Sequence, residues 1–209
     1  MGHMDGPEDA FHPTVVFTEP YWVHDFSRQT SDSWENPFRF SVGRYNEHRP
    51  GMYTTELFGG IRDIHVGLDL GAPVNTPVHA FDKGTVFEVG VNDEAGSYGP
   101  TLITQHHLSL PVVPGGTRLS KPSTFWVLYG HLSLESIQRL KKGQKFERGE
   151  QIAELGAEHE NGGWPPHVHV QISLEKPEKC DLPGVVEASQ RENALELYPD
   201  PRLICGPLY

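Results

Sequence analysis

Apolar residues along this chain fall in short runs that favour strands rather than long helices. The runs are rich in β-branched and aromatic residues, and turn-forming Gly, Pro and Asn lie between them. The first of these runs, at Thr14–Thr18, predicts one short strand within the otherwise irregular polar stretch at residues 5–50. We assign the main strands to Ile64–Leu70, Gly84–Val91, Pro100–Gln105, Thr124–His131, Gln151–Leu155 and His167–Leu174.

Two segments have helical character. Ser133 is placed to cap a short helix over Leu134–Lys141, which would end before Gly143. A second helix is predicted over Val185–Leu197. Many short strands with one or two short helices predict a mainly β fold, with an antiparallel, sandwich-like sheet rather than a doubly wound α/β sheet.

Composition divides the chain into three parts. Residues 1–50 combine a start that resembles an expression-vector remnant with an irregular N-terminal extension. Residues 51–176 form the predicted domain, with a loop insertion at 106–123 that contains several prolines and glycines. Residues 177–209 form a C-terminal tail, which we interpret as a candidate linker to a further domain.

Charge and apolar content limit the partners. The formal net charge of -11 argues against binding to nucleic acid or to an anionic membrane. No apolar run approaches the roughly 20 residues of a membrane span. The two cysteines, Cys180 and Cys205, lie near the C-terminus and are predicted to be free thiols rather than a disulfide scaffold.

Histidine is abundant, with 12 residues, and two local patterns have the chemistry of metal ligands. His65 and Asp69 would lie about 13 Å apart in an extended strand, so they can share a metal only if Gly67 allows a bend. His167 and His169 would face the same side of a strand about 6.6 Å apart. Two histidines and one carboxylate meet the needs of a catalytic zinc ion, which takes three protein ligands and leaves one position open.

Each pattern also has a plain structural interpretation. His65 and Asp69 could form a buried hydrogen-bonded pair in a turn, and His131 could be a strand-end histidine bonded to backbone. His167 and His169 could lie on an exposed strand face or be satisfied in the core. We expect His106 and His107, next to the insertion, to lie on the surface.

Four motifs in order resemble the lysostaphin-type (LytM-like) zinc endopeptidases. They are H-x-G-x-D at 65–69, Y-G-H-L at 129–132, G-x-x-I-A-x-x-G at 149–156 and P-H-V-H at 166–169. The resemblance covers roughly residues 59–172. It implies that His65, Asp69 and His169 bind Zn²⁺, and that His131 and His167 are catalytic. It also implies a groove over the metal and hydrolysis of a peptide or other amide bond by a metal-activated water.

The chain also departs from this family. The tyrosine that often precedes the first ligand is missing, and Tyr53 and Arg62 are candidates for its role. Segments 161–167 and 198–201 resemble a subgroup fused to phosphotransferase and class-III aminotransferase domains. That subgroup would make the chain part of a multidomain cytoplasmic protein; the alternative is an exported protein whose signal peptide is absent. Alternative functions are a non-catalytic metal-binding module, or a hydrolase or cyclase acting on a small amine metabolite.

Overall fold

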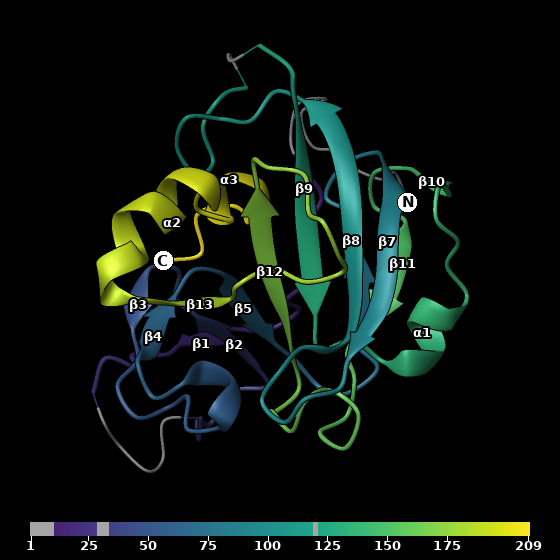
Figure 1. Cartoon of the computed structure of the whole chain (residues 1–209). Coiled ribbons are helices and arrows are strands. Elements are labelled where there is room, and N and C mark those ends of the chain that lie inside the picture. Colours follow the sequence, from purple (N-terminus) through teal and green to yellow (C-terminus); the bar gives the residue numbers. More distant parts are fainter. Residues whose placement is uncertain (1–10, 29–33, 119–120) are drawn as a thin grey trace.

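A computed structural model describes residues 11–28, 34–118 and 121–209. Its centre is an eight-stranded sheet with the order β1-β2-β5-β12-β9-β8-β7-β10 (Figure 1). Strands β1 and β2 are parallel, and the other neighbours are antiparallel. The strands are β1 Tyr21–Val23, β2 Phe40–Gly43, β5 Leu68–Gly71, β7 Gly84–Asn92, β8 Gly99–Leu108, β9 Ser123–Gly130, β10 Lys145–Phe146 and β12 His167–Ser173.

Two smaller sheets and short helices surround the main sheet. One small sheet pairs β6 (Pro77–His79) with β11 (Gln151–Glu154); the other has the order β13-β4-β3. Helix α1 lies on one side of the main sheet, and α2 and α3 lie on the other (Figure 1). The remaining elements are β3 Glu47–His48, η1 Glu56–Phe58, β4 Arg62–His65, α1 Leu134–Gln138, β13 Val185–Glu187, η2 Ala188–Gln190, α2 Arg191–Leu197 and α3 Arg202–Cys205.

Strand β12 shows why the core and the polar cluster lie on opposite faces. Successive side chains of a strand point to opposite sides of the sheet. Val168, Val170 and Ile172 therefore enter the main hydrophobic core, while His167 and His169 point the other way. All seven residues of β12 are buried, because the strand lies between β5 and β9 and is covered on both faces.

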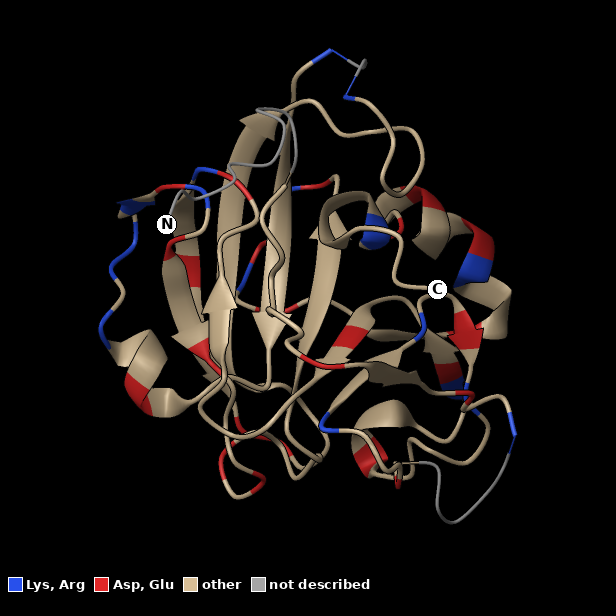
Figure 2. Cartoon of the chain, turned by 180° about the vertical axis from the view of Figure 1, so that it is seen from behind, with Lys and Arg blue, Asp and Glu red and all other residues tan. Residues whose placement is uncertain are grey.

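Charged residues lie mainly on the loops and helices, and the long central strands contain few of them (Figure 2). The loop between β8 and β9, which contains most of the predicted insertion, lies at one end of the sheet (Figure 1). Strand β9 runs away from this loop and ends directly before His131. Among the helices of the described residues, none is long and apolar enough to cross a membrane.

The mainly β, antiparallel fold is confirmed, as are most of the predicted strands. The predicted strand at Thr14–Thr18 is wrong. Val15 packs into the core through its side chain, but Thr14 joins the rest of the protein through one backbone bond, from the His79 amide to the Thr14 carbonyl (2.8 Å). A single bond does not make a ladder.

Three other boundaries differ from expectation. The predicted strand Ile64–Leu70 is two strands, β4 and β5, which belong to different sheets. The predicted helix Val185–Leu197 begins as strand β13, because Val185 and Val186 pair with β4; only its second half is helical. Helix α1 does have Ser133 as its cap, through a bond from the Ser136 amide (3.2 Å), but it ends at Gln138 rather than Lys141.

Candidate metal centre

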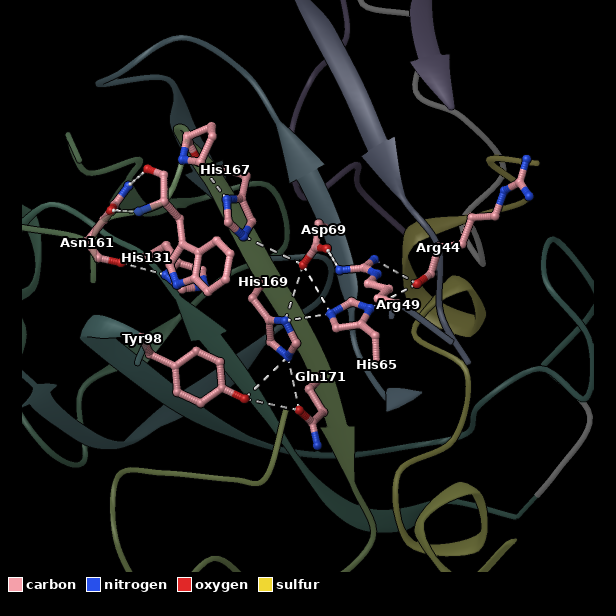
Figure 3. A network of polar contacts seen from close by, with 12 residues as sticks. Arg44, Arg49, His65, Asp69, Tyr98, His131, Asn161, His167, His169 and Gln171 are labelled. Carbon is pink, nitrogen blue, oxygen red and sulfur yellow. Dashed lines mark hydrogen bonds and ion pairs between the residues drawn. The ribbon is translucent and has the colours of Figure 1, made fainter. Parts of the chain in front are cut away.

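Three side chains converge at the end of β4 and across β5 and β12. His65 Nε2 lies 3.1 Å from His169 Nδ1. Asp69 Oδ1 lies 3.2 Å from that Nδ1 and 3.3 Å from His65 Nε2. All three residues are buried, and their side chains point toward one another (Figure 3). Two nitrogens and one carboxylate oxygen thus surround a single point.

Local sequence explains how these residues meet. Asp69 and His169 are directly opposed in the β5–β12 ladder, so their side chains emerge side by side on one face of the sheet. His65 reaches them because the β structure is interrupted at Val66 and Gly67, between β4 and β5. Gly67 also makes room: a Cβ there would lie 2.1 Å from His169 Cε1. The bend expected at Gly67 is present, and the glycine is needed for the close approach of the His169 ring as well.

Hydrogen bonds on the far side of each ring leave acceptors facing the centre. His65 Nδ1 donates to the Arg44 carbonyl (2.9 Å), and His169 Nε2 donates to Gln171 Oε1 (3.0 Å). In neutral imidazoles the opposite nitrogens, His65 Nε2 and His169 Nδ1, then carry lone pairs. Together with the Asp69 carboxylate they form three mutually facing acceptors, an arrangement that a cation stabilises.

The spacing of these three potential ligand atoms fits zinc. Two ligands about 2.1 Å from a tetrahedral zinc ion lie about 3.4 Å apart. The three separations here are 3.1, 3.2 and 3.3 Å. The set of two histidines and one carboxylate is also the type that catalytic zinc sites use.

Two more histidines lie beside this centre. The His131 and His167 rings are 4.3 Å apart, and His167 Nε2 lies 3.7 Å from Asp69 Oδ1. His131 Nδ1 donates to the Asn161 carbonyl and His167 Nδ1 to the Pro165 carbonyl, both at 2.7 Å. In their neutral forms both rings therefore keep the Nε2 lone pair free to accept a proton.

The protonation states suit a metal site. Burial, helped by the charge of Arg49, lowers the pKa of His65 to about 4. Burial also lowers the pKa of His167. The pKa of His131 lies well below its usual range, because the ring is buried and because His167 lies beside it. For Asp69, burial acts to raise the pKa, but the charges of His65 and Arg49 outweigh it and hold the pKa well below its usual range. Neutral histidines and an ionised carboxylate are the forms that bind metal.

The centre lies in the wall of a pocket of about 340 Å³. Aromatic and aliphatic side chains form much of the lining, and they come from segments far apart in the sequence. No described residue of the 106–123 insertion is among them. Besides the site histidines and Asp69, the lining includes Trp34, Arg49, Met52, Tyr53, Leu57, Phe58, Arg62, Tyr98, Trp164, Lys179, Asp181, Leu182, Pro183 and Val185.

The structure brings together the five residues that the sequence motifs pointed to, but several of their neighbours were not predicted. Gln171 could have been found, because it lies two residues after His169 on the same strand face. Arg49, Trp34 and Tyr98 reach the pocket from other segments, and no local pattern marks them. Tyr98 Oη lies 3.5 Å from His169 Nε2.

Several further side chains singled out in the sequence can now be located. Tyr53 and Arg62, the candidates for the missing tyrosine's role, both line the pocket; neither role is tested by position alone. The surface location expected for His106 is wrong, because this ring is buried against Phe81 and Phe125. His107 is exposed as expected, and the thiols of Cys180 and Cys205 are free.

Two histidines and one carboxylate, buried beside a pocket, are a ligand set found in zinc-dependent hydrolases. Residues 63–181, more than half of the chain, match the model of peptidase family M23. The chain belongs to this family, whose members are zinc-dependent metallopeptidases. No protein of curated function matches the chain.

Several solved structures are similar to this chain. A zinc-containing peptidase from Vibrio cholerae is 28% identical over 53% of this chain and 27% of its own length, with a TM-score of 0.38. The catalytic domain of the prophage-encoded M23 protein EnpA from Enterococcus faecalis, in a mutant form, is 24% identical over 71% of this chain and 90% of its own length, with a TM-score of 0.46. The catalytic domain of the antimicrobial peptidase lysostaphin from Staphylococcus simulans is 17% identical over 72% and 90%, with a TM-score of 0.45.

Proposed function

We propose that His65, Asp69 and His169 hold a zinc ion and that the protein hydrolyses a peptide or other amide bond in the adjoining pocket. The convergence of three potential ligand atoms at zinc-like spacing carries this proposal. Zinc in such a site supplies a Lewis acid that activates water and polarises a carbonyl.

His167 and His131 supply the proton chemistry in this proposal. The free Nε2 of His167 lies next to Asp69 and so is placed to accept a proton from the attacking water. His131, whose ring lies 4.3 Å from that of His167, would receive this proton on Nε2, and the protonated ring would then give it to the leaving amine or stabilise negative charge on the carbonyl oxygen. The backbone carbonyls at Asn161 and Pro165 hold both rings in the required tautomer.

The pocket lining also bears on the substrate. Aromatic and aliphatic groups line the pocket beside the centre, and they include Trp34, Tyr53, Trp164, Leu182 and Val185. Such walls gain free energy by covering an apolar side chain, and a chain of bare glycines offers none. We therefore propose a substrate with a bulky apolar or aromatic group beside the scissile bond.

The metal content of the purified protein tests the central proposal. We expect about one zinc per chain in the unaltered protein and loss of that zinc in His65→Ala and His169→Ala, because each change removes one of three ligands. His107→Ala, which alters an exposed histidine outside the cluster, is the control and keeps its zinc. An unaltered protein that takes up no zinc from solution would refute the proposal. Zinc without turnover of any peptide or amide would favour a metal-binding module instead.

A further inference from the structure

The chain before the family-matched region reaches directly into the metal centre. Family M23 matches residues 63–181, yet Arg49 Nη1 donates to Asp69 Oδ2 at 2.8 Å. The Arg49 side chain is only 2% exposed, so water contributes little to screening this pair. A buried charge is costly unless it is well paired. Removing either partner of this ion pair would therefore destabilise the folded protein.

Arg49 divides the two oxygens of Asp69 between separate tasks. Oδ2 accepts from the guanidinium, whereas Oδ1 faces His65 and His169 at 3.3 and 3.2 Å. The carboxylate is thereby fixed about its side-chain torsions, with one oxygen presented to the centre (Figure 3). Hydrogen bonds of this kind to a metal ligand fix its orientation and tune its affinity for the ion.

The same guanidinium also supports a second ligand. Arg49 Nη2 donates to the Arg44 carbonyl (3.1 Å), and this carbonyl accepts from His65 Nδ1 (2.9 Å). One side chain therefore touches Asp69 directly and His65 through a shared acceptor. The groups that support Asp69 and His65 in this way both come from segment 44–49, which lies outside the matched region.

Arg49 itself is held in place from behind. Its Nε donates to Glu47 Oε2 at 2.9 Å, and Glu47 Oε1 accepts from the Phe26 amide at 3.1 Å. The Phe26 ring lies under the guanidinium, 4.8 Å from its carbon to the ring centroid. These contacts link a backbone amide, Glu47, Arg49 and Asp69 in one buried chain.

We infer that Arg49 is a positioning residue of the metal centre, and that segment 44–49 sets its affinity for zinc by orienting Asp69 and His65. This inference rests on the proposed zinc site and adds a role for residues outside the recognised family domain.

Zinc affinity of the full chain, measured by competition with a chromophoric chelator, tests this inference. We expect Arg49→Met to raise the zinc dissociation constant about 10- to 100-fold, the range for loss of such a supporting contact. Arg49→Lys keeps the charge but not the forked geometry, so its dissociation constant falls between those of Arg49→Met and the unaltered protein. Arg39→Met, at an exposed arginine paired with Glu19, is the matched control and leaves the dissociation constant unchanged.

A double variant separates positioning from a merely structural role. Arg49→Met leaves two buried carboxylates without their cation, so thermal stability of the zinc-free protein should also fall. Adding Glu47→Gln removes one of these charges and should restore part of that stability, while Asp69 still lacks its partner. We expect zinc affinity to stay low in the double variant.

Two results would overturn the inference. One is a folded Arg49→Met protein with unchanged affinity; the other is an affinity that recovers together with stability in the double variant. If Arg49→Met does not fold, the same comparison is made with Arg49→Lys. Loss of zinc in His65→Ala combined with normal affinity in the Arg49 variants would reject the role of Arg49 alone. Absence of zinc from the unaltered protein would reject both this inference and the proposed function.

Discussion

His131 has an unusual backbone for a histidine, with φ at 63°. This left-handed conformation is uncommon outside glycine, and such strain is found at functional positions. Bonds from the His131 amide to the Tyr98 carbonyl (2.8 Å) and from the Gly156 amide to the His131 carbonyl (3.0 Å) hold it. The ring is thus fixed by its backbone as well as by Asn161.

The proposed proton role of this ring gives a prediction about turnover. His131→Ala should lower kcat about 10²- to 10⁴-fold, as loss of a general acid or base does, while the zinc content stays unchanged. His167→Ala should behave in the same way. Steady-state rates and metal analysis on the same preparations check both. Variants that lose zinc, or that keep full turnover, would contradict the assignment.

Gly67 gives a second prediction for a single residue. Gly67→Ala places a methyl group against the His169 ring, so the ring must shift from the position in which it faces Asp69 and His65. We expect zinc binding to weaken at least tenfold and the free energy of unfolding to fall by about 1–3 kcal/mol, as for overpacking. Gly143→Ala is the comparison: it has open space but a positive φ, so it should lose about 1–2 kcal/mol and keep its zinc affinity.

At the scale of single elements, β8 carries a buried histidine outside the metal centre. His106 donates through Nδ1 to the Lys83 carbonyl at 3.0 Å and contacts Thr104 Oγ1 through Nε2 at 2.8 Å. Burial is the main reason that its pKa falls from 6.5 to about 4. Between these two pH values the folded protein keeps the His106 ring neutral, whereas the unfolded chain protonates it.

This difference predicts a loss of stability in acid. Between about pH 6.5 and 4 the unfolded state binds a proton at His106 that the folded state does not, so the free energy of unfolding falls as the pH falls. The contribution is at most about 3 kcal/mol. Urea unfolding at pH 7 and pH 4.5 should show a smaller loss for His106→Gln than for the unaltered protein. Equal losses in the two proteins would contradict this account.

Sequence patterns predicted the elements whose structure depends on nearby residues, and they failed where an element depends on pairing with a distant part of the chain. The alternation along β12 was sufficient to place His167 and His169 on one face. The start of the Val185–Leu197 segment was not predictable in this way, because its β structure comes from pairing with β4, more than 100 residues earlier in the chain. For the same reason, no pattern near Arg49 indicates that its partner is Asp69.

On the scale of the whole molecule, the pocket is assembled from most of the chain. Its lining runs from Trp34 to Val185, and therefore includes residues on both sides of the family-matched region. Trp34 and Trp164 have ring centroids 6.3 Å apart, and Trp164 is 5.9 Å from Tyr53. This aromatic group is where we expect the apolar part of the substrate to lie.

The corresponding prediction concerns substrate preference. A peptide with Leu or Phe beside the scissile bond should exceed its glycine counterpart about 10- to 100-fold in kcat/KM, since burying such a side chain is worth about 1.5–3 kcal/mol. Trp34→Ala should reduce this ratio without changing zinc content. Trp22→Ala, at an exposed tryptophan outside the pocket lining, should leave the ratio unchanged. A preference for glycine in the unaltered protein would reject the proposed substrate class.

The loop between β8 and β9 has a practical consequence. It projects from the end of the sheet from which β9 runs toward His131, and its Val112 side chain is 80% exposed. A dye, biotin or short peptide label attached there would be a strand's length from the chemistry. The protein can therefore be anchored to a sensor surface by this loop with its pocket facing the solution, so that binding of candidate substrates is measured directly.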